Sequence, residues 1–76
     1  MYLVIPQAID GSEYGADRVP TKREALLVAK ELRDEGEVEA VYVWNVAPDA
    51  DGLLERIADD PVWFWRSERH IEYGRR

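Results

Sequence analysis

The sequence predicts a small single domain of the α/β class, with α+β as the alternative, in which a three-stranded sheet packs against two helices. The chain of 76 residues has the length of one domain. Runs rich in β-forming residues alternate with segments of helical periodicity, in the order β-α-β-α-β. The run that is apolar on both of its sides lies near the middle of the chain, which favours a central strand there.

The first strand is expected over residues 2–10, because YLVIPQAID is rich in β-forming side chains. Pro6 has no N–H to donate to a neighbouring strand, which places this strand at a sheet edge or at a bulge. The connection over residues 11–20 contains two glycines. Within it, Arg18 and Val19 are candidates for a short arm that pairs back on the first strand.

The clearest element is a helix over residues 22–35. Thr21 and Glu24 form the capping-box pattern, in which each side chain bonds a backbone amide that the first helical turn leaves unpaired. Gly36 stands where a left-handed residue commonly ends a helix. Leu27 falls on the polar side. The apolar side, at helical spacing, comprises Ala25, Val28, Ala29 and Leu32, with Leu26 at its flank.

The central strand is expected over residues 38–46, VEAVYVWNV. Val41 and Val43 point to one side of this strand, because side chains alternate along a strand. The other side carries Val38, Ala40, Tyr42, Trp44 and Val46.

The second helix is expected over residues 50–60, where Asp49 or Asp51 would cap its start and Pro61 would end it. Its apolar side would consist of Leu53, Leu54, Ile57 and Ala58.

The last strand is expected over residues 62–73, VWFWRSERHIEY, because its Val, Trp, Phe, Ile and Tyr residues favour strands. A helix that begins at Asp60 and Pro61 is the alternative. Residues 74–76 form a tail.

In the simplest arrangement, both helices lie on the same side of the sheet, because crossovers between neighbouring parallel strands are right-handed. The other side of the sheet is then bare, and it carries either Tyr42 and Trp44 or Val41 and Val43. Helices on opposite sides of the sheet are the alternative, and they would leave no bare face.

The composition narrows the functional classes. The chain has no cysteine, which excludes disulfides, thiolate catalysis and cysteine zinc sites. It has no apolar run of the roughly 18 residues that a membrane helix needs and no signal peptide, so a cytoplasmic location is expected. The net charge of −6 opposes the phosphate backbone and disfavours direct binding of nucleic acid.

No catalytic group is expected. The single histidine, His70, lies three residues from Ser67, and the two side chains cannot share one side of a strand. The chain has no glycine-rich phosphate loop and no cofactor motif. Glu68, His70 and Glu72 would share one side of a strand, but alternate residues stand about 7 Å apart, which is too wide for one metal ion. A metal-binding protein or enzyme that uses these three residues is therefore only an alternative function.

The aromatic residues supply the candidate binding site. On a strand, Trp63 and Trp65 point to one side and Phe64 points to the other. Tryptophan, tyrosine and arginine are the residue types that dominate protein interfaces. The candidate partner-binding residues are Trp65, Arg66, Arg69, Tyr73, Tyr42 and Trp44.

The expected function is therefore that of a small, acidic, non-enzymatic protein–protein interaction module. It would bind a partner protein, or itself as a homodimer, through an exposed sheet face or through the C-terminal strand. By analogy of size and charge alone, it would suit a phage- or mobile-element-type accessory or inhibitor protein. The second alternative is a single-stranded nucleic-acid binder that uses Trp65, Arg66 and Arg69.

Overall fold

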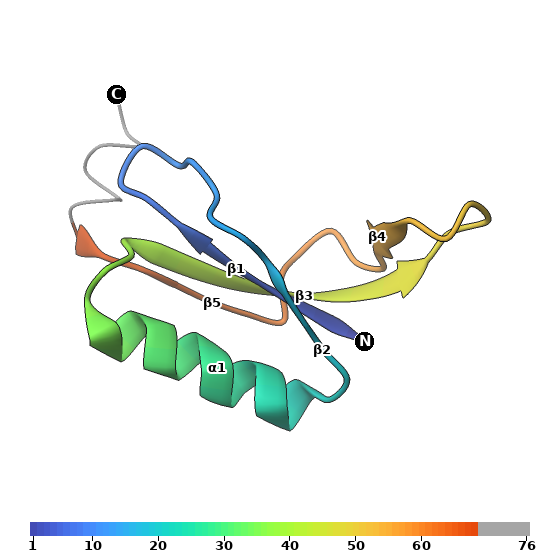
Figure 1. Ribbon diagram of the computed structural model, residues 1–76, viewed down its shortest axis with the longest axis horizontal. Helices are drawn as coiled ribbons and strands as arrows, with labels where there is room; N and C mark the ends of the chain where they lie inside the picture. The colour runs from blue at the N-terminus through green and yellow to red at the C-terminus, as the bar shows by residue number, and fades with distance from the viewer. Residues whose placement is uncertain (69–76) are drawn as a thin grey trace.

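The computed structural model describes residues 1–68, which form an α+β domain with a helix against an antiparallel five-stranded sheet (Figure 1). The elements are β1 (Tyr2–Gln7), β2 (Asp17–Val19), α1 (Lys22–Glu35), β3 (Ala40–Pro48), β4 (Leu54–Arg56) and β5 (Trp63–Arg66).

The strands are arranged around β3. One edge of β3 pairs with β1, and β1 pairs in turn with β2 at the margin of the sheet. The other edge of β3 is shared by two short strands, because β5 pairs with its residues 40–43 and β4 pairs with its residues 46–48. β4 and β5 therefore lie end to end along the same edge, and residues 57–62 leave the sheet between them.

The central position of the third expected element is confirmed, although β3 runs over residues 40–48 and not 38–46. The parallel arrangement that right-handed crossovers implied is wrong. β2 reverses the direction of the chain before α1 begins, so β3 enters the sheet antiparallel to β1. The expected pairing of Arg18 and Val19 with the first strand is confirmed, and it is this short strand that changes the topology.

The expected edge position of the first strand is wrong, because β1 lies between β2 and β3. Pro6 is tolerated there for a local reason. β2 pairs only with Tyr2–Val4, so it ends before Pro6. The Pro6 carbonyl instead accepts a hydrogen bond from the backbone N–H of Tyr14. The missing N–H of Pro6 therefore falls beyond the end of β2, where it interrupts no pairing.

Helix α1 has the bounds that its capping pattern predicts. The Thr21 hydroxyl accepts a hydrogen bond from the backbone N–H of Glu24 at 3.2 Å. At the other end Gly36 is left-handed, with φ of 75°, and its N–H bonds the carbonyl of Arg33. Ala25 and Ala29 are fully buried, and Leu27 is exposed, as the helical pattern predicts.

The predicted helix over residues 50–60 is wrong. The Asp49 carboxylate accepts hydrogen bonds from the backbone N–H groups of Asp51 and Leu53, at 2.8 and 2.9 Å, and so holds a tight turn. Gly52 adopts a φ of 82° in this turn. The chain then returns as β4 along β3. Asp49 thus organises a hairpin and not the start of a helix.

The strand interpretation of the last segment is confirmed for Trp63–Arg66. The predicted strand over residues 62–73 is longer than β5, because the chain leaves strand geometry at Ser67. The Ser67 N–H donates to the Glu39 carbonyl, and the Ser67 hydroxyl bonds the Glu39 carboxylate. Residues 69–73 of the predicted strand lie outside the described residues.

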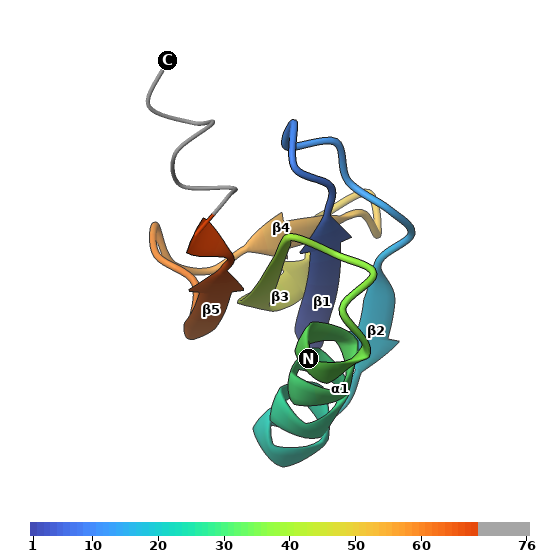
Figure 2. The same cartoon turned by 90° about the vertical axis from the view of Figure 1, so that its left-hand side faces the viewer.

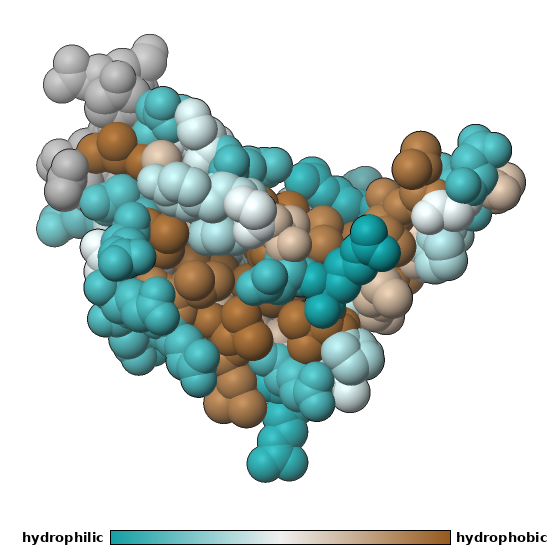
Figure 3. All heavy atoms as spheres, in the orientation of Figure 1, coloured by the Kyte–Doolittle hydropathy of each residue, from teal (hydrophilic) through white to brown (hydrophobic). Residues whose placement is uncertain are grey.

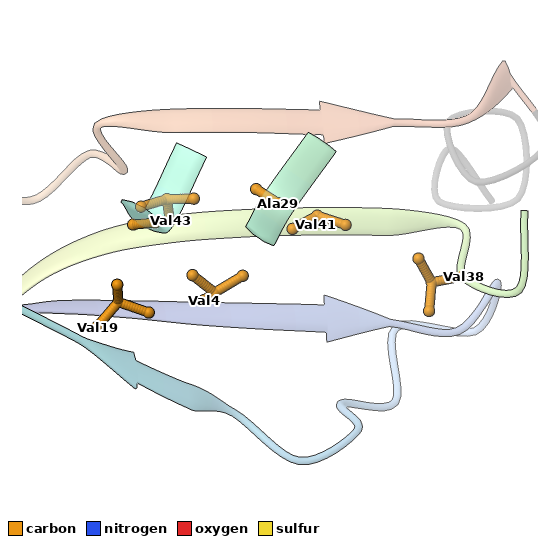
Figure 4. Close-up of a cluster of buried hydrophobic side chains, with 7 residues drawn as sticks. Val4, Val19, Ala29, Val38, Val41 and Val43 are labelled. Carbon is orange, nitrogen blue, oxygen red and sulfur yellow. The ribbon is translucent and has the colours of Figure 1, made fainter. Parts of the chain in front are cut away.

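Helix α1 covers one side of the sheet, here called the helix face. The small Ala25 and Ala29 let the helix approach the sheet closely, and Trp63 and Trp65 seal one margin of this core. Val38 also belongs to this cluster, although the sequence pattern placed it on the same side as Tyr42. The reason is that β3 begins at Ala40, so Val38 lies before the strand and does not follow its alternation. The buried residues of this cluster are Val4, Val19, Ala25, Ala29, Val38, Val41 and Val43 (Figure 4).

The left-handed end of α1 gives a first prediction. Gly36→Ala is expected to lower the free energy of unfolding by about 1 kcal/mol, because a Cβ is disfavoured at positive φ. No atom lies within 4 Å of the added Cβ, so the cost is purely conformational. Gly15→Ala is the matched control, since Gly15 has equally open surroundings and no positive φ. Urea unfolding measures both; an equal response of the two variants would contradict the prediction.

The start of α1 gives a second prediction. Thr21→Ala removes the acceptor for the Glu24 N–H and is expected to cost about 1 kcal/mol of stability. Thr21→Ser keeps the hydroxyl and is expected to retain most of that stability. Chemical denaturation monitored by circular dichroism compares the two variants. Equal loss in both would show that the hydroxyl does not cap the helix.

Candidate functional site

The side of the sheet that faces away from α1 is called here the open face. In residues 1–68 the helix packs only against the opposite side, as the view along the strands shows (Figure 2). A second hydrophobic cluster, smaller than the first, lies on the open face. It consists of Ile5, Trp44 and Val46, with Leu3, Tyr42 and Leu54 packed against them.

The register of the strands brings aromatic rings together at the centre of the open face. Ile5, Tyr42 and Phe64 are direct cross-strand neighbours, from β1, β3 and β5 respectively. The rings of Tyr42 and Phe64 stack with centroids 6.0 Å apart and planes inclined by 16°. Phe64 is 51% exposed, so this stack reaches the surface. A large apolar side chain is thus left in solvent on the edge strand β5.

Two arginines lie over rings of the open face. The Arg56 guanidinium carbon is 3.8 Å from the centroid of the Trp44 ring, and that of Arg66 is 5.1 Å from the Phe64 ring. Arg56 reaches Trp44 because β4 places it opposite Val46, two residues along β3. Trp44 is only 9% exposed, although no helix covers its side of the sheet in the described part of the chain. Attraction between a guanidinium and an aromatic ring stabilises such contacts.

The charged residues of the strands separate by sign. Arg18 is opposite Leu3, Arg56 is opposite Val46 and Arg66 is opposite Ala40, so all three arginines belong to the open face. Asp17 is opposite Val4 and Glu55 is opposite Ala47, which places both carboxylates on the other side. The named strands therefore present positive charge on the open face, although the chain as a whole carries −6. Outside these strands, the isolated bridge of Glu13 with Gln7 adds one carboxylate to the same face.

The predicted site residues divide among these surfaces. Tyr42, Trp44 and Arg66 come together on the open face. Trp65 lies on the opposite side, packed against the cluster beneath α1. Arg69 and Tyr73 lie outside the described residues.

Sequence reasoning missed two residues of the open face. Strand alternation correctly set Phe64 apart from Trp65, but it did not join Phe64 to Tyr42, because that contact depends on the β3–β5 register. Arg56 was missed because its segment was predicted to be helical. A turn signal was nevertheless present, because Asp49 follows Val46 by three residues and Gly52 follows Asp49 by three more. Aspartate and glycine at such positions are typical of a hairpin turn.

The described residues hold no cluster of side chains suited to binding a metal ion. Among residues 1–68, no group of three or more carboxylates, imidazoles or thiols comes close enough together to hold a metal ion. Glu68 belongs to this range, whereas His70 and Glu72 of the metal alternative lie outside it. The Ser12 N–H bonds the Asp10 carboxylate at 2.9 Å and lowers the pKa of that exposed carboxyl, which makes Asp10 a poor proton donor near neutral pH.

A surface pocket of about 320 Å³ lies between the ends of β1 and α1. Its ionisable side chains are one carboxylate and one phenol, Glu37 and Tyr14. Within residues 1–68, no second carboxylate lines it to form an acid–base pair with Glu37. Its lining residues are Pro6, Tyr14, Leu32, Glu37 and Val38.

Hydrophobic side chains also reach the surface on the arm formed by β3 and β4, which projects from the rest of the molecule (Figures 1 and 3). Leu53 is exposed at the turn of this arm, and Ile57 is exposed just after β4. None of the helices in residues 1–68 combines the length and the apolarity needed to cross a membrane. Single exposed apolar side chains are common on protein surfaces and do not by themselves indicate a contact.

Comparison with protein-family models, with curated proteins and with solved structures finds no match to this chain. The geometry of the open face is therefore the basis on which a function is argued.

Proposed function

We propose that this chain is a protein–protein interaction module that binds its partner through the open face. The observation that carries the proposal is the stack of Tyr42 and Phe64, which leaves Phe64 51% exposed on the edge strand β5, beside the partly buried Tyr42 of the central strand. Aromatic residues are enriched in protein interfaces, and a few such residues supply most of the affinity. The module acts by binding and not by catalysis.

The size of the chain supports the same function. A domain of this length buries only about 60% of the surface that its unfolded chain exposes, so its margin of stability is small. A partner that covers the open face would stabilise the folded state by mass action. The resemblance in size and charge to phage- or mobile-element-type inhibitors stays a prediction.

Site-specific crosslinking tests the proposal. A photoreactive amino acid at position 64 is expected to form a covalent adduct with the partner protein in cells of the source organism. The same group at position 27 is the matched control, because Leu27 is also a large exposed apolar residue, 57% exposed, but lies on the outer side of α1. Adducts from position 27 and none from position 64 would place the contact on the helix and overturn the proposal.

The shift in thermal unfolding that the partner protein causes gives an independent test of the proposal. Phe64→Ser is expected to leave the midpoint of thermal unfolding of the free protein within a few degrees, because Phe64 is half exposed. It is expected to abolish the stabilisation that the captured partner gives to the wild-type chain. Leu27→Ser is expected to respond to the partner as the wild type does. Full partner-induced stabilisation of Phe64→Ser would contradict the proposal.

A further inference from the structure

We infer that the partner presents two carboxylate groups close together on one extended segment or one helix face, and that Arg56 and Arg66 each receive one carboxylate. This inference rests on the proposed function, since it names the chemistry of the surface that the open face binds. It is argued from the geometry of the two arginines, from their spacing and from the sign of the charge on this face.

A guanidinium that lies flat over a ring keeps its N–H donors at its rim, where they point away from the ring. Arg56 is 3.8 Å from the centroid of Trp44 and approaches this geometry closely. Within residues 1–68 the ion pair that forms joins Arg33 to Asp34 on α1, and it includes neither Arg56 nor Arg66. Both guanidiniums therefore lie within cation–π distance of a ring, and neither is used by a carboxylate of residues 1–68. A planar, held guanidinium binds a carboxylate through two parallel hydrogen bonds.

The spacing follows from the register. Arg56 is opposite Val46 and Arg66 is opposite Ala40, which are six residues apart on β3. At about 3.3 Å per residue, the backbone positions of the two arginines stand about 20 Å apart along β3. Each side chain reaches inward, however, because the Arg56 guanidinium lies over Trp44 and that of Arg66 lies over Phe64, the cross-strand neighbour of Tyr42. Tyr42 and Trp44 are two residues apart on β3, so the two guanidiniums lie over rings about 7 Å apart along the strand. Alternate residues of an extended segment, or residues one turn apart on a helix, span this distance.

Charge selects an acidic partner over a second copy of this chain. Two open faces packed together would bring arginines against arginines, and like charges across an interface are costly. Glu13, opposite Gln7, is an acidic residue on the same side, but three strand spacings separate it from Arg66. Other acidic residues lie on α1, in the turn that begins at Asp49 and at Asp59 and Asp60 after β4. At physiological salt, charges separated by more than about 8 Å are largely screened, so these groups do not repel a carboxylate that lies beside Arg56 or Arg66.

The packing of the rings favours a protein, and not a single-stranded nucleic acid, as the partner of the open face. Nucleic-acid platforms offer free ring faces on which bases stack. Arg56 already covers the Trp44 ring, and Tyr42 and Phe64 stack on each other. The net charge of −6 adds long-range repulsion of the phosphates.

Selection of peptides from a random displayed library on the immobilised full chain tests the inference. Selected peptides are expected to carry two Asp or Glu residues, two positions apart in an extended peptide or four positions apart in a helical one. Arg56→Gln and Arg66→Gln are each expected to weaken binding of these peptides by about tenfold or more, as the loss of a charge-assisted pair predicts. Arg23→Gln, which removes the same charge from the first turn of α1, is the control and is expected to bind as the wild type. Arg56→Lys keeps the charge but not the two-pronged donor geometry, and intermediate binding is expected.

The outcomes separate this inference from the proposed function. Peptides without acidic residues that still require Phe64 would overturn the inference and leave the interaction module standing. Peptides that bind Phe64→Ser as well as the wild type would overturn both. Binding of a dT12 oligonucleotide that is lost in Arg56→Gln would replace the acidic protein with a nucleic acid. A dimer seen by light scattering and dissociated by Phe64→Ser would replace it with a second copy. Unfolding curves recorded for every variant show whether a loss of binding reflects a loss of folding.

Discussion

The pairing of β3 along both of its edges is the constraint on which the rest of the structure depends. A strand in that position must be apolar on both sides, and β3 satisfies this with two different kinds of side chain. Val41 and Val43 are short and β-branched, so a helix can pack closely above them. Tyr42 and Trp44 are large and cover their side of the sheet with their own rings. The difference between the two sides decides where α1 packs and which face is left open.

The arginines complete that second side. A chain of this length has no second helix in its described part to lay over Trp44, and the stem and guanidinium of Arg56 serve instead. Long basic side chains commonly cover apolar surface with their stems while their charged ends stay in water. The same contact thus has two consequences in this protein. It helps to keep a tryptophan out of solvent in the free chain, and it holds the Arg56 guanidinium on the open face, where we infer that a carboxylate binds.

Local signals made α1 predictable to the residue, because Thr21, Glu24 and Gly36 act within one turn of the helix ends. The helix predicted over residues 50–60 was wrong. The apolar residues from Leu53 to Ala58 fit helical spacing, but the pairing of this segment with β3 decides its structure. Sequence alone could not separate parallel from antiparallel strands either, since the outcome depends on a three-residue strand, β2. At the candidate site, residue types such as Tyr42 and Arg66 were predictable, whereas the contact of Arg56 with Trp44 requires the register of β4.

The end-to-end arrangement of β4 and β5 divides β3 into two mechanically different halves. The first half is clamped between β1 and β5, whereas the far end beyond Val46 is held by the three cross-strand pairs of β4. A two-stranded ribbon of that length is marginal in water, so backbone amides of the arm exchange with solvent through local opening long before the core does. Because Arg56 belongs to the arm, each such opening lifts the guanidinium from Trp44. The indole is therefore uncovered transiently by fraying and not by global unfolding.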